Sequence, residues 1–242
     1  MARIFSFALG NIWRWTKSKN RNVLIKYAKI LDIDGVELTF AKKEELYSFK
    51  LSKDNKSWLK SLDYVSIHAP FKLIREAKNE EEIIKQLDII SKLYDEIEAK
   101  NVIIHPTDLP KAEILKDYDF SILTENLPKR KNITISNLRK IFNKYPQIGL
   151  CLDVSHAYLW SKYETSKLVK AFKNKIMEIH LSGTYRRKDH QSLRKVSKDF
   201  LFSIQPIKKL NVPIVIEEDI EKRSLKFVKE EIEYIKSFFS NP

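Results

Sequence analysis

The chain has 242 residues, 43% of them hydrophobic and 11% aromatic, which suits one domain with a full hydrophobic core. It carries 45 Lys and Arg against 32 Asp and Glu, a net charge of +13, and its single cysteine excludes an intrachain disulfide. No apolar run approaches the roughly 20 residues that cross a bilayer. We therefore expect a soluble, cytoplasmic protein without a membrane or an obligate protein partner.

Eight apolar runs, rich in Ile, Val, Leu and Phe, recur along the chain and predict β-strands. They occupy residues 4–9, 36–40, 64–68, 102–105, 121–125, 148–153, 176–181 and 213–217. Their apolarity is continuous rather than alternating, which is typical of parallel strands covered on both faces.

Amphipathic segments alternate with these strands and predict helices. They occupy residues 23–31, 42–51, 79–100, 135–143, 166–172, 198–210 and 224–239. The longest begins with Asn79 and Glu82, spaced as in a capping box. We predict an α/β protein whose residues 1–242 form a single (β/α)8 TIM barrel. The alternative is a doubly wound open sheet.

All five histidines end or follow a strand-like run: His68, His105, His156, His180 and His190. Carboxylates stand at similar positions: Glu37, Glu125, Asp153 and Glu217. Each residue alone is more often a structural hydrogen-bonding group. A barrel, however, brings all the carboxyl ends of its strands to one mouth, where grouped carboxylates would repel one another unless divalent metal ions were shared among them. The joint pattern predicts a metal site.

The successive motifs resemble the endonuclease IV family of the xylose-isomerase-like TIM barrels. The similarity runs in unbroken order from about Gly35 to Glu217. Its motifs are Ser66-Ile67-His68-Ala69-Pro70-Phe71, Ile104-His105-Pro106, Glu125-Asn126, Leu152-Asp153-Val154-Ser155-His156-Ala157, His180-Leu181-Ser182, Asp189-His190-Gln191-Ser192-Leu193 and Ile216-Glu217. Each motif alone is weak, but the combination is specific.

The resemblance implies a first zinc ion on His68, His105 and Glu125. It implies a second on Glu125, Asp153, His180 and Glu217, and ligands of a third in His156 and His190. Catalysis would depend on Glu125, Asp153 and Glu217. Members of the family hydrolyse the DNA backbone on the 5′ side of abasic sites, so damaged duplex DNA is the implied partner. Zn²⁺ is the implied metal, with Mn²⁺ as an alternative.

The sequence departs from the family pattern in four places. Lys188 stands where the family has an aspartate. The adjacent Asp189 could substitute for it, but neighbouring residues on an extended backbone point apart, which opposes a third metal ion. Arg194 replaces a glycine, and Phe71 stands where such endonucleases tend to have tyrosine. The chain is also shorter than typical members. The resemblance thus implies two metal ions and leaves the third open.

Basic and aromatic residues follow the first and seventh strands. Arg186, Arg187 and Lys188 could neutralise phosphates, while Trp13, Trp15 and Phe71 could stack on a base or fill an abasic gap. In the alternative interpretation the tryptophans cap the barrel and the charges are solvated. The net charge has the same two interpretations: a polyanionic partner, or a Lys- and Glu-rich surface of the heat-adapted kind.

Two other functions compete with the phosphodiesterase. A divalent-metal sugar or sugar-phosphate isomerase or epimerase would need only Glu125, Asp153, His180 and Glu217. A nucleic-acid-binding barrel that has lost its chemistry is the third possibility, but it would bury these charges without the ions that stabilise them. Glu37 has no assigned role; it either orients a histidine or pairs with a lysine.

Overall fold

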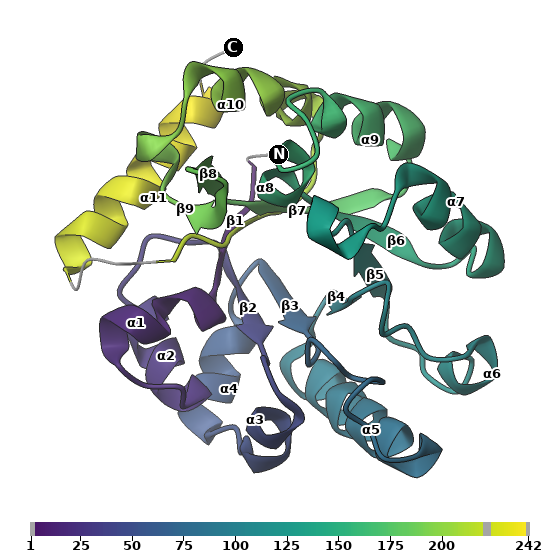
Figure 1. Ribbon diagram of the computed structural model, residues 1–242. Coiled ribbons are helices and arrows are strands. Elements are labelled where there is room, and N and C mark those ends of the chain that lie inside the picture. Colours follow the sequence, from purple (N-terminus) through teal and green to yellow (C-terminus); the bar gives the residue numbers. More distant parts are fainter. Residues whose placement is uncertain (1–2, 220–223, 241–242) are drawn as a thin grey trace.

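A closed barrel of eight parallel strands forms the centre of the computed structural model, which describes residues 3–219 and 224–240, except for the side chains of Arg14 and Trp15 (Figure 1). The strands are β1 (Phe5–Ala8), β2 (Gly35–Thr39), β3 (Tyr64–His68), β4 (Asn101–Ile104), β5 (Ile122–Glu125), β6 (Gly149–Asp153), β7 (Ile176–Leu181) and β10 (Ile214–Ile216). Neighbours in the barrel are neighbours in the chain, and β10 closes it against β1. The predicted fold class is confirmed.

The strands are buried on both faces, as their continuous apolarity predicts. Every residue of β1, β2, β3, β4, β5 and β6 is buried. The outer side of the barrel packs against a ring of helices (Figure 1). The longer ones are α2 (Arg21–Ala28), α3 (Lys43–Ser48), α4 (Lys53–Lys60), α5 (Glu80–Ile97), α7 (Ile135–Lys144), α9 (Glu164–Phe172), α10 (Lys198–Ser203) and α11 (Leu225–Ser240).

Short helical segments fill the connections. They are η1 (Leu9–Ile12), α1 (Trp13–Thr16), α6 (Ala112–Leu115), η2 (Lys129–Lys131), α8 (Val154–Tyr158), η3 (Leu193–Lys195) and η4 (Gln205–Lys209). The helix expected over residues 198–210 is divided into α10 and η4, because Pro206 has no backbone N–H to continue an α-helix. A helix not expected from the sequence, α4, begins where the Ser52 hydroxyl caps the Asn55 backbone N–H.

The predicted start of α5 is confirmed in part. The Asn79 side chain accepts a hydrogen bond from the Glu82 backbone N–H at 3.0 Å, as an N-cap does. The Glu82 carboxylate, however, accepts from the Lys78 backbone N–H at 2.7 Å rather than from that of Asn79. The helix then buries Leu87, Ile90 and other apolar side chains of one face against the barrel.

An antiparallel hairpin, β8 (Gly183–Tyr185) and β9 (Lys188–Gln191), extends the chain beyond β7 and was not predicted from the sequence. It lies over the barrel near α8 and α11 (Figure 1). Its backbone has positive φ at Arg186, Arg187 and His190, of 50°, 61° and 54°. The hairpin therefore differs from a plain extended segment at three of its residues.

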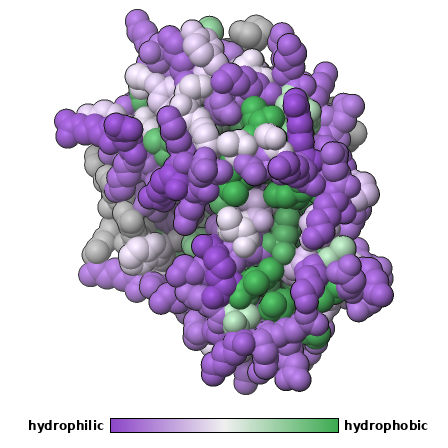
Figure 2. All heavy atoms as spheres, turned by 45° about the vertical axis from the view of Figure 1, so that its right-hand side comes forward, coloured by the Kyte–Doolittle hydropathy of each residue, from purple (hydrophilic) through white to green (hydrophobic). Residues whose placement is uncertain are grey.

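The surface is dominated by polar side chains. On the face shown in Figure 2, hydrophilic residues surround a narrow strip of hydrophobic ones. Within the described ranges, no helix is long and apolar enough to span a membrane.

Candidate metal centre

Histidines and carboxylates from six strands converge at the carboxyl end of the barrel. His68, Glu125, Asp153 and His180 lie in β3, β5, β6 and β7, while His105 and Glu217 directly follow β4 and β10. The strand register sets Asp153 beside His180. A pocket of about 310 Å³ opens onto this end, lined by His68, His105, Glu125, His156, Asp189, His190, Glu217 and neighbouring basic and apolar side chains.

The junction between β5 and β6 fixes two of these groups. The Asn126 side chain donates to the Asp153 carbonyl at 2.8 Å and accepts from the Asp153 N–H at 2.9 Å. Asp153 in turn caps α8, because its Oδ1 accepts from the His156 backbone N–H at 2.6 Å. Two local interactions thus place Asp153 and His156 side by side.

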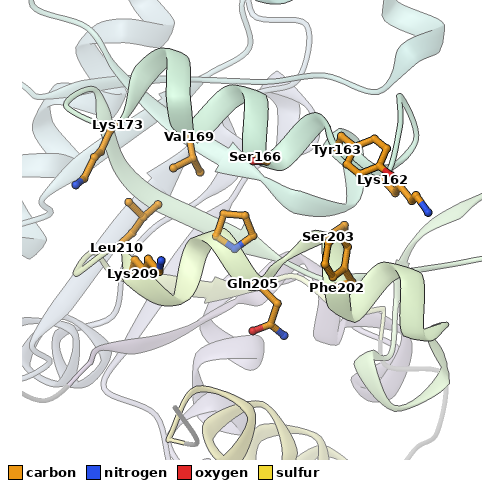
Figure 3. A pocket seen from close by; sticks show the side chains of 11 residues that line it. Lys162, Tyr163, Ser166, Val169, Lys173, Phe202, Ser203, Gln205, Lys209 and Leu210 are labelled. Atoms are coloured by element: carbon orange, nitrogen blue, oxygen red, sulfur yellow. The ribbon is translucent and has the colours of Figure 1, made fainter.

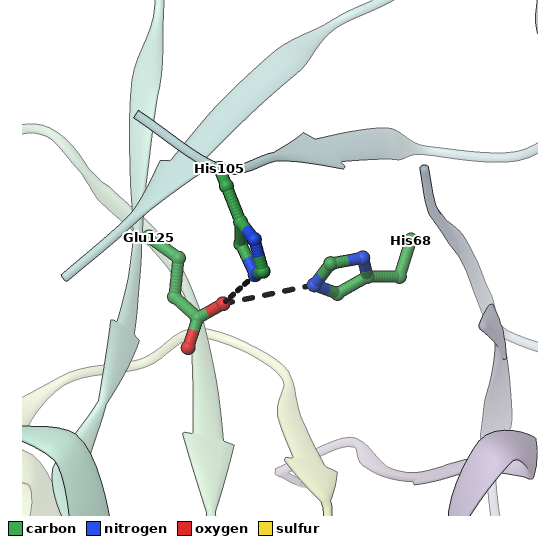
Figure 4. Close-up of side chains that lie close together, drawn as sticks. All are labelled: His68, His105 and Glu125. Atoms are coloured by element: carbon green, nitrogen blue, oxygen red, sulfur yellow. Dashed lines mark ion pairs between the residues drawn. The ribbon is translucent and has the colours of Figure 1, made fainter. Parts of the chain in front are cut away.

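The first group of candidate ligands consists of His68, His105 and Glu125 (Figure 4). The Nε2 atoms of His68 and His105 lie 3.6 and 3.4 Å from Oε2 of Glu125. Both imidazoles converge on one carboxylate oxygen, and a Zn²⁺ ion takes ligands of these two kinds.

The second group brings together Glu125, Asp153, His180 and Glu217. Ligand atoms of Glu125, Asp153 and His180 lie within 4.8 Å of one another, and His180 Nδ1 lies 3.1 Å from Oε2 of Glu217. Asp153 Oδ2 and His180 Nδ1 are buried without a hydrogen-bond partner among the described residues. Two buried hydrogen-bond acceptors that face other acceptors are costly unless a cation lies between them. This set of ligand atoms therefore fits a divalent ion.

The third group consists of His156, Asp189 and His190. His156 Nε2 lies 3.7 Å from Oδ2 of Asp189. The sequence predicted that Asp189 and His190 point apart, which is wrong: the left-handed φ of His190 turns the backbone so that both reach the same cluster. Lys188 is exposed and is not among the described residues that line the pocket.

Every histidine of the chain has one ring nitrogen against a fixed oxygen atom and the other directed into these groups. The first nitrogens contact Ala69 O for His68 (2.9 Å), Phe71 O for His105 (3.3 Å), Asn126 O for His156 (3.1 Å) and Glu217 O for His190 (3.1 Å). For His180 the contacts are Glu37 Oε2 (3.1 Å) and Glu178 Oε1 (2.9 Å). Such contacts fix the tautomer and leave a lone pair free for a metal.

Glu178 is the one member of this arrangement that the sequence did not indicate. It lies in β7 two residues before His180, so the two side chains share a face of the strand. Its carboxylate also accepts a hydrogen bond from the Tyr64 hydroxyl and lies 3.7 Å from Cys151 Sγ. A charged residue inside an otherwise apolar strand was the available signal. Glu37, whose role was open, contacts His180 and pairs with no lysine among the residues that the structure describes.

The pocket favours positive charge. Burial alone would lower the pKa of His156, but Asp153 and Glu125 outweigh it and raise that pKa to about 10. Burial raises the pKa of Asp153 to about 6. Burial would likewise raise the pKa of Glu217, but the charge of His180 lowers it to about 2. Protons on imidazoles or divalent ions can both supply this charge.

The predicted substrate-binding residues are divided among three places. Phe71 is 38% exposed and stacks on His105, with ring centroids 5.4 Å apart. Trp13 lines a second hollow of about 290 Å³ that shares Phe71, His190 and Glu217 with the first. Arg186 and Arg187 line a separate hollow beside the hairpin. The Trp15 side chain lies outside the described residues.

A further hollow of about 450 Å³ lies outside the barrel, between α9 and the α10–η4 segment (Figure 3). Its walls include Tyr163, Phe202 and several lysines. None of the described residues that line it is a carboxylate or an imidazole, so it offers none of the metal or acid–base chemistry of the barrel mouth.

Comparison with known proteins shows similarity in structure only. No family model matches the chain, and no curated protein matches its sequence. A D-tagatose 3-epimerase-like protein has a TM-score of 0.72 at 17% identity, over 98% of this chain and 97% of that one. Endonuclease IV from Thermus thermophilus has a TM-score of 0.69 at 16% identity, over 99% of this chain and 100% of that one.

A xylose isomerase domain containing protein from Salmonella typhimurium has a TM-score of 0.70 at 15% identity, over the whole of both chains. At such low identity these likenesses establish the architecture and leave the reaction open. The protein has the xylose-isomerase-like (β/α)8 fold, and the solved structures similar to it include an endonuclease IV, a D-allulose 3-epimerase and a D-tagatose 3-epimerase-like protein.

Proposed function

We propose that the protein is a metal-dependent phosphodiesterase that resembles endonuclease IV and cleaves DNA on the 5′ side of abasic sites. The observation that carries the proposal is the set of three contiguous ligand groups, in which each histidine is held by one nitrogen and offers the other. His68 and His105, together with Glu125, form a second group of metal ligands, which a single-metal isomerase with four ligands would not need. The structural similarity to an endonuclease IV supports this choice.

The residues would hold divalent ions, most simply Zn²⁺, in two groups that share Glu125, with a third group at His156, Asp189 and His190. When bound, such ions stabilise negative charge on a phosphoryl oxygen and lower the pKa of water, which is the chemistry that phosphodiester hydrolysis needs.

The chain's own residues would bind and orient the substrate. Phe71 and Trp13, each 38% exposed, present apolar faces at the mouth of the barrel where a base or an abasic gap could lie. Lys72, Arg75, Arg130 and Lys131 line the metal pocket and would neutralise phosphates. Of these, Arg75 and Lys72 form ion pairs of 2.7 Å with the buried Asp108 and with Glu76, whereas Arg130 lies 3.9 Å from Asp189. Arg130 and Lys131 are therefore the better candidates.

A sugar or sugar-phosphate isomerase or epimerase is the second candidate. Glu125, Asp153, His180 and Glu217 alone could hold one divalent ion for such a reaction. The structural similarity to an epimerase-like protein favours it. A neutral sugar, however, gives no reason for basic side chains around the pocket, nor for the pair His68 and His105.

An assay on duplex DNA that carries one abasic analogue tests the proposal. We expect nicking on the 5′ side of the analogue, its loss with a chelator and its recovery with Zn²⁺ or Mn²⁺. Glu125→Gln should abolish it, whereas Glu80→Gln, an exposed carboxylate on α5, should not. Intact duplex at high enzyme concentration, together with Mn²⁺-dependent interconversion of ketoses, would contradict the phosphodiesterase and support the isomerase.

A further inference from the structure

The tip of the β8–β9 hairpin is a turn of two arginines in a backbone conformation that disfavours them. Tyr185 pairs with Lys188, so Arg186 and Arg187 are the two turn residues, with φ of 50° and 61°. Positive φ at both positions is the geometry of a type I′ turn, in which Asn-Gly is preferred. A side chain with a Cβ atom is strained there.

Contacts within the protein do not explain why arginine stands at these positions. The Arg186 guanidinium lies 5.2 Å from the centre of the Tyr185 ring, and both arginines are exposed. Arg187 makes no hydrogen bond or ion pair with another described residue. Local strain that is retained without an internal benefit points to a function at the site.

The two arginines border a hollow of about 420 Å³, which we call the hairpin pocket. Its walls include Tyr158 of α8, Tyr185, Arg186, Arg187, and Lys195 and Ser197 after the hairpin. No carboxylate is among the described residues that line it. Three cations, two phenol rings and the Ser197 hydroxyl therefore meet around one space. Guanidinium groups bind phosphate, and aromatic rings stack on bases irrespective of sequence.

The hairpin pocket is a separate hollow from the metal pocket, but two segments of the chain lead from one to the other. The helix α8 that carries Tyr158 also carries His156, and β9 carries Asp189 and His190 directly after the arginine turn. A chain molecule bound at the metals could therefore continue along α8 or along the hairpin to the hairpin pocket.

We propose that the hairpin pocket binds a single strand of nucleic acid where it passes beyond the metal centre. A backbone phosphate would lie between Arg186 and Arg187, and an adjoining base against Tyr185, which is 41% exposed. This inference rests on the proposed function, because it assigns the path of the same substrate. The inference implies that the arginine turn makes the folded protein less stable and strengthens its binding to nucleic acid.

The double variant Arg186→Asn/Arg187→Gly separates these two properties. We expect its Tm to rise by about 4 °C, because the turn strain is relieved. We expect its affinity for a labelled oligothymidylate, measured by fluorescence anisotropy on chelator-treated protein, to fall about tenfold or more. The slope of log affinity against log salt should become shallower by about 0.7, since one phosphate is no longer neutralised.

The matched control is Arg139→Asn/Lys140→Asn, which also removes two positive charges, but from exposed positions on α7. It should keep the affinity of the parent protein. Equal affinity losses in both variants, an unchanged affinity in the turn variant, or a Tm that falls in the turn variant would overturn the inference. Displacement of the oligonucleotide by a sugar phosphate at equal phosphate concentration would also overturn it.

The outcomes also distinguish this inference from the proposed function. Oligonucleotide binding that depends on the arginine turn, in a protein that never nicks abasic DNA, would contradict only the phosphodiesterase. Nicking by the parent protein, with unchanged oligonucleotide affinity in the turn variant, would contradict only the role of the hairpin pocket.

Discussion

His180 is the residue on which most of the proposed chemistry converges. Its Nε2 faces Glu37 and Glu178 on the inner side, and its Nδ1 faces Glu217 at the mouth. Glu178 is held by the Tyr64 hydroxyl, which accepts a hydrogen bond of 2.6 Å from the Asn101 side chain. The histidine is therefore oriented by a buried polar network rather than by packing alone.

Glu178→Gln should weaken metal binding without unfolding the protein. The amide has nearly the same shape, but it removes a negative charge that makes the His180 ring a better ligand. We expect the Zn²⁺ affinity, measured by competition with a chelating indicator, to fall about 10- to 100-fold.

The matched comparison is Tyr64→Phe, which removes the hydroxyl from the same network but leaves both carboxylates on His180. It should cost less metal affinity than Glu178→Gln. Equal Zn²⁺ affinities for Glu178→Gln and the parent protein would contradict the positioning role.

Sequence patterns identified the histidines of the site but not all of the residues that contact them. The five imidazoles could be found because they end or follow apolar runs, and parallel strands carry such positions to one face. Glu178 was missed because it lies inside a strand, and burial of a carboxylate there depends on Tyr64, far away in the sequence. Asp189 and His190 were expected to point apart, because a left-handed φ at a histidine has no signal in the sequence.

The hairpin and the last helix are joined by a pair of buried carboxylates. Glu218 follows β10, Glu231 lies in α11, and each is 1% exposed. Glu218 accepts from the Leu193 backbone N–H at 2.7 Å, and Glu231 accepts from the Ser192 hydroxyl at 2.7 Å. The Glu218 bond ties the chain just after His190 to the end of the barrel, and the Glu231 bond ties it to α11. Burial raises the pKa of Glu218 well above its usual value, and the neighbouring Glu231 carboxylate raises it further.

Glu218→Gln should stabilise the protein at high pH. A carboxyl whose folded pKa is raised contributes its stability at pH values below the unfolded pKa, and loses it as pH rises through the folded pKa. The amide keeps an acceptor for the Leu193 N–H and does not ionise. We expect the free energy of unfolding of the variant at pH 9 to be at least about 1 kcal/mol higher than that of the parent protein. Urea titrations of the two chelator-treated proteins measure this difference.

At pH 5 the difference should be small, because Glu218 is protonated in the folded parent protein. Glu230→Gln, a half-exposed neighbour on α11, is the control and should show no such pH dependence of the difference. A Glu218→Gln variant that is less stable than the parent by the same amount at both pH values would contradict this assignment.

Helices and strands could be predicted where the hydrophobic pattern of the sequence was strong. All eight barrel strands were found because both of their faces are apolar. The hairpin was not, because its strands are three and four residues long and end in a run of charges. The segment 198–210 kept a helical pattern through Pro206, although the proline changes the type of helix.

The whole molecule combines a net charge of +13 with a barrel mouth that is rich in acid. Part of the excess is balanced locally, as in the pairs Lys43–Glu82 and Arg75–Asp108. Lys131, Arg186 and Arg187 remain around the pockets at this end, together with Arg130, whose nearest carboxylate is Asp189 at 3.9 Å. A basic rim around an acidic centre suits a polyanion that meets bound cations.

Binding of duplex DNA should therefore depend strongly on salt. If several phosphates are neutralised, log affinity should fall linearly with log salt, with a slope steeper than about −3 between about 50 and 200 mM KCl. Fluorescence anisotropy with a non-cleavable duplex measures it. A slope near zero would instead support the interpretation that the lysines are ordinary surface, as in heat-adapted proteins.

The barrel as a whole followed from the order of its elements, since eight strands alternating with helices leave few other arrangements. Which substrate reaches the mouth did not follow, because the same fold occurs in similar structures named as an endonuclease, an epimerase and an epimerase-like protein.

The most direct test is the number and position of metal ions in the purified protein, from elemental analysis together with anomalous X-ray scattering. We predict two or three ions per chain, with one between His68, His105 and Glu125 and one between Asp153, His180 and Glu217. Glu125→Gln should lose ions from both groups. A pocket that stays empty in crystals soaked with zinc and with manganese would contradict the metal centre.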